Sequence, residues 1–125
     1  MKIINTEPNH RDSRGLIVDL LTGKSVSAIT FISFTPGAVR GNHYHEKTTQ
    51  WNYVIAGRVR LVTQFGSDAV QEMILCKGDL VETPPNEKHA LVGIEDAEMI
   101  VFTEGPRGGK DYELDTIRLK HPLVK

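Results

Sequence analysis

The sequence predicts a single domain built almost entirely of β-strands that close into a barrel. Apolar runs of strand length recur at short intervals, and residues that favour turns separate them. No stretch repeats apolar residues at helical spacing over three turns. A chain of 125 residues can bury one core but not two. We therefore expect one domain over residues 1–125 and one functional site.

The expected strands are short and rich in branched and apolar side chains. In chain order they cover residues 16–21, 28–34, 51–56, 58–65, 70–76, 80–83, 90–92 and 97–103. Gly, Pro, Asn and Asp cluster between them, for example at 35–37 and 84–86, where they favour tight turns. Strands and turns at this spacing are typical of an antiparallel barrel or sandwich.

Residues 58–65 illustrate how such a strand divides its side chains between two faces. Valine, leucine, threonine and phenylalanine occupy the odd positions, whereas arginine and glutamine hold most of the even positions. Alternation with a period of two predicts one face toward the core and one toward water or a partner.

Charge and composition exclude several classes of partner. The 15 basic and 16 acidic residues give a net charge of −1 and form no run of one sign, so we expect no nucleic-acid partner. No apolar stretch is long enough for a signal peptide or a membrane span, which predicts a soluble, cytoplasmic protein without a membrane partner. The lone Cys76 ends an apolar run and is expected to be buried.

Three histidines are candidate ligands or catalytic groups. If the segment around His43 and His45 is extended, the period of two puts both imidazoles on one face. His89 follows a proline-rich turn at the head of another expected strand and offers a third nitrogen. Such a set could bind zinc, iron, manganese or nickel.

The spacing of these residues resembles the two motifs of the cupin superfamily. The matching positions of the two motifs, between residues 37 and 93, are Gly37, His43, His45, Gly57, Gly78, Pro84 and His89. The resemblance implies a jelly-roll barrel with a metal site at His43, His45, Gln50 and His89. Gln50 replaces the usual glutamate, and its neutral carbonyl would hold a cation less tightly. Asn86 replaces a motif glycine, and asparagine tolerates positive φ.

Two shorter stretches resemble cupins that act on nucleotide-linked keto-sugars. Residues 12–15 and 40–44 are similar to segments of dTDP-4-dehydrorhamnose 3,5-epimerases, whereas Arg40, Gly41, His43, His45 and Gln50 together resemble the sugar 3,4-ketoisomerases. The latter are regarded as metal-free.

This resemblance implies epimerisation or isomerisation by removal of a proton beside the ketone. His43 would be the base, His45 a relay, and Arg40 and Arg14 substrate-binding residues. Tyr53, on an expected barrel strand, is the candidate acid. Tyr112, in the loop over residues 105–112, is a weaker candidate.

Two alternatives remain open. In the first, His43, His45 and His89 bind a metal in a dioxygenase or a metal-assisted isomerase, and His43 is then unavailable as a free base. In the second, the barrel binds a sugar or metabolite without catalysis, because a fold alone does not determine chemistry. Under every reading we expect a small-molecule ligand and a homodimer.

Overall fold

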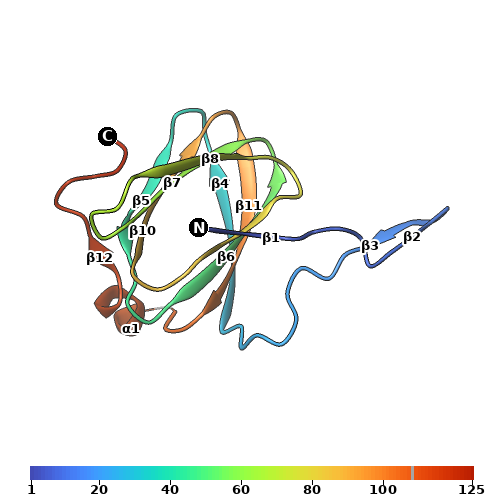
Figure 1. Cartoon of the computed structure of the whole chain (residues 1–125), viewed down its shortest axis with the longest axis horizontal. Helices are drawn as coiled ribbons and strands as arrows, with labels where there is room; N and C mark the ends of the chain where they lie inside the picture. Colours follow the sequence, from blue (N-terminus) through green and yellow to red (C-terminus); the bar gives the residue numbers. More distant parts are fainter. Residues whose placement is uncertain (108) are drawn as a thin grey trace.

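Two antiparallel five-stranded sheets face each other and form a barrel in this computed structural model, which describes residues 1–107 and 109–125 (Figure 1). One sheet has the strand order β1-β9-β6-β11-β4 and the other β12-β5-β10-β7-β8. The elements are β1 (Lys2–Ile4), β2 (His10–Asp12), β3 (Gly15–Ile17), β4 (Ala28–Phe34), β5 (Val39–Tyr44), β6 (Thr49–Ala56), β7 (Val59–Phe65), β8 (Gln71–Leu75), β9 (Leu80–Thr83), β10 (Glu87–Gly93), β11 (Ala97–Glu104), α1 (Gly109–Leu114) and β12 (Ile117–Arg118). The predicted all-β jelly-roll barrel is confirmed.

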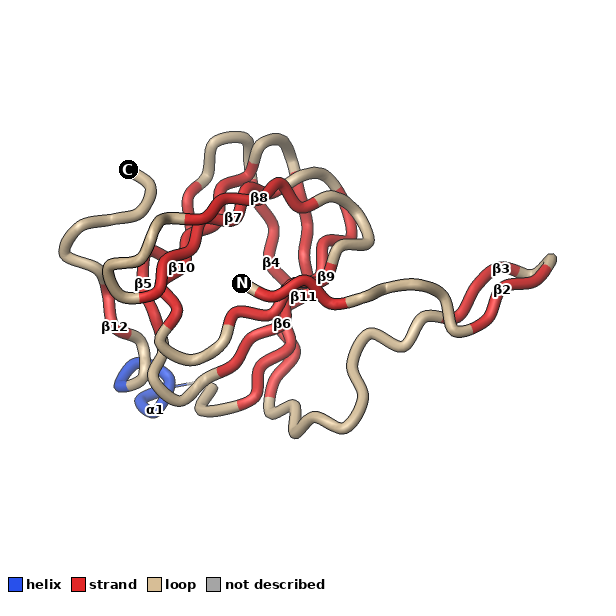
Figure 2. Tube along the Cα trace, viewed as in Figure 1, coloured by secondary structure: helices blue, strands red, loops and turns tan. Residues whose placement is uncertain are grey.

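The chain before β4 departs from the expectation of a barrel strand over residues 16–21. Only Gly15–Ile17 is extended there, and it pairs with His10–Asp12 in a hairpin outside both barrel sheets. Figure 2 shows this hairpin projecting from the barrel. Leu16 and Ile17 remain exposed, so their apolar character does not reflect burial in this chain.

The alternation predicted for the barrel strands is realised in β7 and β11. In both, residues at every second position are buried, and Leu61 and Met99 are wholly inaccessible. Inward side chains of both sheets interdigitate in one apolar cluster that also contains Val54 and Leu91. Burying side chains of this size contributes about 1.5–3 kcal/mol each, which makes the cluster the main stabilising element of the fold.

The inward face changes from apolar to polar along the barrel. On β6 the inward residues are Val54, then Asn52, then Gln50, and on β10 Leu91 gives way to His89. The neighbouring strand β11 adds another polar residue beside Gln50, because Thr103 lies opposite it in the cross-strand register. One end of the barrel is therefore a hydrophobic core, and the other is a lined cavity.

Cys76 is exposed, contrary to the expectation of a buried thiol. Strand β8 ends at the buried Leu75, so the next residue begins the turn to β9. The Cys76 N–H donates to Oδ2 of Asp79 at 2.8 Å, which fixes it in that turn.

The C-terminal segment closes against β5. Helix α1 is a single short helix, and β12 pairs with the end of β5 at Tyr44 and His43. Asn42 binds the tail beyond β12 through its side chain, with Nδ2 2.9 Å from the Val124 carbonyl and Oδ1 3.1 Å from the Val124 N–H. Within the described residues, no helix has the length and apolar character needed to span a bilayer.

Candidate active site

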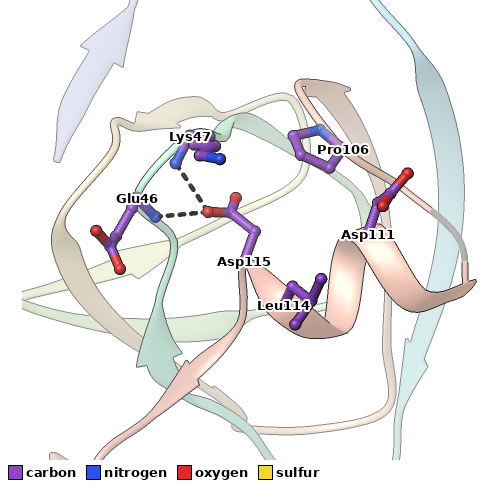
Figure 3. Close-up of a pocket in the computed structure, with 6 residues that line it drawn as sticks. All are labelled: Glu46, Lys47, Pro106, Asp111, Leu114 and Asp115. Atoms are coloured by element: carbon purple, nitrogen blue, oxygen red, sulfur yellow. Dashed lines mark hydrogen bonds between the residues drawn. The ribbon is translucent and has the colours of Figure 1, made fainter.

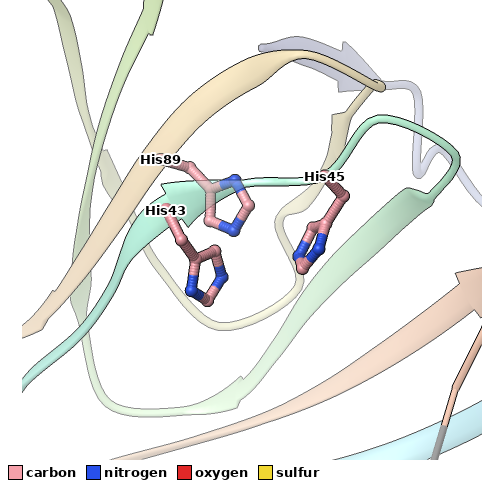
Figure 4. A group of neighbouring side chains, drawn as sticks. All are labelled: His43, His45 and His89. Carbon is pink, nitrogen blue, oxygen red and sulfur yellow. The ribbon is translucent and has the colours of Figure 1, made fainter. Parts of the chain in front are cut away.

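The three histidines predicted from sequence meet at the polar end of the barrel. His43 is the penultimate residue of β5, His45 directly follows the end of that strand, and His89 lies on the adjacent strand β10 (Figure 4). The ring centroid of His43 is 4.8 Å from that of His45 and 4.7 Å from that of His89. His43 and His89 line a cavity of about 210 Å³ with ten further residues, whereas His45 stands beside it.

A bulge in β5 turns His43 toward the cavity. The register between β5 and β10 shifts at His89 and Ala90, next to Gly41 and Asn42, which both have positive φ. A Cβ atom on Gly41 would lie 2.9 Å from the His89 carbonyl oxygen, so only glycine permits this approach of the two strands. The sequence Arg-Gly-Asn-His thus encodes the bulge as well as the functional side chain.

Hydrogen bonds fix the ring orientation of two of the histidines. His45 donates from Nδ1 to the Asp115 carbonyl at 3.0 Å, and His89 donates from Nδ1 to the Glu87 carbonyl at 3.3 Å. Because a carbonyl oxygen only accepts, both rings carry their proton on Nδ1 and keep a free lone pair on Nε2. Within the described chain, Nε2 of His45 and Nδ1 of His43 are buried without a hydrogen-bond partner.

Burial keeps all three imidazoles neutral. Loss of hydration, and then the neighbouring imidazoles, lowers the pKa of His43 to about 3. The same two causes lower the pKa of His89 to about 4. Burial also lowers the pKa of His45, although its hydrogen bond to Asp115 acts in the opposite direction. At neutral pH the cluster therefore presents lone pairs and no positive charge.

The rest of the cavity wall mixes polar residues with the apolar Ile32, Leu91 and Val101, and none of its described residues is acidic. Gln50 and Asn52 face the cavity from β6, and Asn52 donates from Nδ2 to the Val81 carbonyl at 3.1 Å. Two arginines, Arg40 and Arg107, also line it, and the Arg40 guanidinium donates to the Ser33 carbonyl at 3.0 Å. Fixed positive charge without a neighbouring carboxylate suits an anionic ligand.

A tyrosine from the C-terminal helix completes the site. Tyr112 of α1 lines the cavity, and its ring centroid is 5.6 Å from that of His45. The Arg107 guanidinium lies 4.2 Å from the centre of the Tyr112 ring, a distance typical of a cation–π contact. Tyr112, the weaker candidate for the acid from sequence, is thus the described tyrosine that lines the cavity.

Besides His45, which stands beside the cavity, two further predicted site residues, Tyr53 and Arg14, do not line it. Tyr53 lies on the outer face of β6, where it lines a shallow pocket with Val18 and Lys77. The cause is the strand period of two, because Gln50 and Asn52 occupy the inward face. Arg14 lies on the projecting hairpin, where its Nη2 is 2.6 Å from the Asp12 carboxylate, and it is remote from the cavity of its own chain.

Asn86 and Gln50 depart from the cupin motifs described from sequence. Asn86 has φ of 70°, as predicted for a residue that replaces glycine. Its N–H donates to the His45 carbonyl at 2.6 Å, so this turn also holds the histidine segment. Gln50 lines the cavity beside His43 and His89, where its amide oxygen can serve as a neutral donor.

The donor set fits a divalent metal ion. The candidate nitrogen atoms of the three histidines lie within 4.8 Å of one another, and two buried ring nitrogens are unpaired. Metal–imidazole bonds of about 2.0–2.1 Å place two donors at most about 4.2 Å apart, so the rings would have to move closer together to hold one ion. Neutral imidazoles are the form that binds a metal.

Residues 10–105 match the family described as the polysaccharide biosynthesis C-terminal domain. The chain belongs to this family. This chain is 31% identical over 98 residues to a curated protein, the UDP-2-acetamido-2,6-beta-L-arabino-hexul-4-ose reductase of Pseudomonas aeruginosa. The match covers 76% of this chain and 26% of the reductase. The chain is also 30% identical over 107 residues to oxalate decarboxylase OxdC of Bacillus subtilis, covering 82% and 27%. The chain thus spans about a quarter of the length of either relative.

Solved structures confirm the cupin fold of this family member. The TDP-quinovose 3,4-ketoisomerase of Campylobacter jejuni aligns with a TM-score of 0.80 at 19% identity, covering 94% of this chain and 92% of that one. The dTDP-4-dehydrorhamnose 3,5-epimerase of Sulfolobus tokodaii aligns with a TM-score of 0.68 at 19% identity, covering 80% and 68%. A 3,4-ketoisomerase of Thermoanaerobacterium thermosaccharolyticum, in complex with TDP-4-keto-6-deoxyglucose, aligns at 0.77 with 18% identity, covering 94% and 86%.

Proposed function

We propose that this cupin epimerises or isomerises a nucleotide-linked keto-sugar by moving a proton at the carbon beside the ketone. The observation that carries the proposal is a single cavity that holds neutral imidazoles, two arginines and a tyrosine hydroxyl, without an acidic residue among its described lining. The arginines would bind the diphosphate, and the imidazoles would face the sugar ring. The nucleotide-sugar substrates named for similar proteins support this class of ligand.

His43 is the proposed base. Its pKa of about 3 reflects burial and the positively charged forms of its neighbours, neither of which compensates a positive charge on the ring. A bound anionic sugar nucleotide and the developing enolate would both favour the protonated imidazole, which brings its basicity closer to neutral pH. The Arg40 guanidinium lines the same cavity and is the proposed partner of the negative charge.

Tyr112 replaces Tyr53 as the proposed proton donor. It is the described tyrosine that lines the cavity, and the Arg107 guanidinium lies 4.2 Å from the centre of its ring. The proton would pass from the phenolic oxygen to carbon, while His43 retains the proton removed from the substrate.

The histidine cluster itself favours a second, metal-assisted form of the same reaction. His89 is 5% exposed and has no role in the metal-free scheme, whereas a metal site needs a third imidazole. A bound divalent ion would supply Lewis acidity toward the substrate's oxygen atoms, with Gln50 as a neutral fourth donor. In that form His43 binds the ion and another group must accept the proton.

One pair of measurements tests the function and separates the two forms. Metal content per chain is measured on untagged protein, for wild type and His89→Ala. Candidate keto-sugar nucleotides are then incubated with each protein in deuterated solvent. Exchange of the proton beside the ketone supports the proposal, and its absence with every tightly bound sugar nucleotide would refute it in favour of binding alone.

The His89 variant distinguishes the two forms of the reaction, whereas the His43 variant tests both. His43→Ala is expected to abolish exchange in both. His89→Ala should lose metal and activity together in the metal-assisted form, but should keep most exchange in the metal-free form. Full activity of His43→Ala on an identified substrate would contradict both forms.

A further inference from the structure

Asp115, directly after α1, binds the turn that follows His45. Its side chain is buried, with 6% of the residue exposed. Oδ1 accepts hydrogen bonds from the backbone N–H groups of Glu46 and Lys47, both at 3.0 Å (Figure 3). Oδ2 accepts the Thr48 hydroxyl proton at 2.5 Å. Three bonds to one charged acceptor hold residues 46–48 to the C-terminal segment.

The main-chain carbonyl of the same residue accepts the Nδ1 proton of His45. In water an imidazole exchanges between two neutral tautomers, and a fixed partner at one nitrogen selects one of them. This partner selects the Nδ1–H form and leaves the lone pair on Nε2, which is buried and unpaired in the described structure. The hydrogen bond therefore determines which nitrogen is available to a proton or a metal.

Backbone hydrogen bonds hold both residues that form this contact, Asp115 and His45. The Asp115 N–H donates to the carbonyls of Asp111 at 3.3 Å and Tyr112 at 3.1 Å, which ties it to the last turn of α1. On the other side, Asn86 holds the backbone of His45. The pairing of β12 with β5 also holds the C-terminal segment to the histidine strand, beginning two residues beyond Asp115. The carboxylate adds the side-chain contact nearest to the His45 ring, on the turn that directly follows it.

We propose that Asp115 is a positioning residue: its carboxylate fixes the turn at residues 46–48, so that its carbonyl holds His45 as the Nδ1–H tautomer. The catalytic meaning of this arrangement rests on the proposed function, since the Nε2 lone pair serves either proton transfer or metal binding. The tautomer is a property of the free protein and can be measured without a substrate.

The test is long-range ¹H–¹⁵N NMR of histidine-labelled protein, stripped of metal with a chelator and held above neutral pH. Wild type should show a protonated Nδ1 and an unprotonated Nε2 for His45. In Asp115→Ala the population of the Nε2–H tautomer should rise about fivefold, the change expected from losing one ordinary hydrogen bond. The His43 and His89 signals report whether the barrel remains folded.

Glu113→Ala is the matched control, because it removes an exposed carboxylate from α1 that makes no side-chain hydrogen bond in the described structure. It should leave the His45 tautomer unchanged. If Asp115→Ala does not fold, two milder variants replace it. Asp115→Asn keeps both backbone bonds through Oδ1 and should retain the wild-type tautomer of His45. Thr48→Val removes the hydroxyl that donates to Oδ2 and should lower the population of the Nδ1–H tautomer. An Nε2–H tautomer in wild type, or an unchanged one in Asp115→Ala, would overturn the inference.

Turnover is scored separately, so that failure of the two proposals can be distinguished. Where a keto-sugar substrate is identified, Asp115→Ala should lower kcat more than it raises KM, since ligand-binding arginines are untouched. A tautomer shift without any turnover in wild type would support the positioning role and refute the enzymatic function. Normal kcat with a shifted tautomer would show that Asp115 does not act through His45.

Discussion

At the scale of single residues, the site depends on keeping three histidines neutral and correctly oriented. His89 is nearly inaccessible, and its pKa lies below the ordinary value of 6.5, at about 4. In the unfolded chain the same imidazole is hydrated and binds a proton more readily. Folding therefore becomes less favourable wherever the unfolded state alone is protonated.

This linkage predicts how stability changes with pH. As pH falls from about 6.5 toward 4, the free energy of unfolding of metal-free protein should decrease, with at most about 1.4 kcal/mol per pH unit from His89. Urea unfolding of chelator-treated protein across this range measures the slope. His89→Gln should make the slope shallower and leave the part that His43 and His45 contribute, whereas His121→Gln, which changes an exposed histidine, should leave the slope unchanged. Equal slopes in wild type and His89→Gln would contradict the buried, neutral state of His89.

Two tyrosines provide a second test at this scale. Tyr112→Phe removes the hydroxyl inside the cavity and should lower kcat about 10²–10⁴-fold, the usual contribution of a general acid, with little change in ligand affinity. Tyr53→Phe makes the same chemical change on the outer face of β6 and should retain normal kcat. Steady-state kinetics on the exchanging substrate compare them. A stronger effect of Tyr53→Phe would restore it as the acid.

At the scale of elements, the bulge in β5 brings the histidines together. Gly41 and Asn42 both take positive φ beside β10, and this local shift in register lets His43 and His89 meet. The bulge needs glycine at position 41, because a Cβ atom there would collide with backbone atoms of His89 and Ala90 rather than with a flexible side chain.

A pair of glycine substitutions separates backbone strain from this collision. Gly41 and Gly37 have similar positive φ, +89° and +81°, but a Cβ at Gly37 would meet nothing within 4 Å. Both alanine variants should incur about 1–3 kcal/mol of backbone strain. Gly41→Ala should lower the free energy of unfolding more than Gly37→Ala does, and it should also shift the NMR signals of the histidines. Equal losses of urea stability in the two variants would show that the close approach to β10 is not limiting.

At the scale of the whole molecule, the outer side of β4 and β11 carries a group of apolar side chains. Ile29 and Phe31 of the edge strand β4 are exposed, and they lie opposite Phe102 and Ile100 of β11 on the same side of the sheet. The projecting β2–β3 hairpin also exposes apolar side chains, and an isolated two-stranded hairpin is marginal in water. A second copy of this chain would cover both features.

We therefore expect a homodimer formed through the β4 face. Phe31→Asp should shift the protein from dimer to monomer, because it places a charge in a desolvated contact. Ile74→Asp is the control, since Ile74 is exposed on the edge strand of the other sheet but lies opposite Arg60. Analytical ultracentrifugation gives the mass of each variant. A monomeric wild type, or a dimer that survives Phe31→Asp, would contradict this assembly.

The sequence by itself determined the barrel and its histidines. Strand length, period-two alternation and turn residues are local properties, so they indicate the all-β class directly, and residues 37–93 carry both cupin motifs. The pairing of His43 with His45 follows from the same local period. Asn86 in a glycine position was likewise explained by its own backbone preference.

Only the tertiary structure decided which residues surround those histidines. The inward face of β6 excluded Tyr53 in favour of Gln50 and Asn52, and the absolute phase of an alternation cannot be read when both faces of a strand are partly buried. Tyr112 and Asp115 reach the site across about seventy residues of chain, by packing of a segment without periodic pattern. Contacts of that kind depend on how the barrel closes, which no local sequence signal encodes.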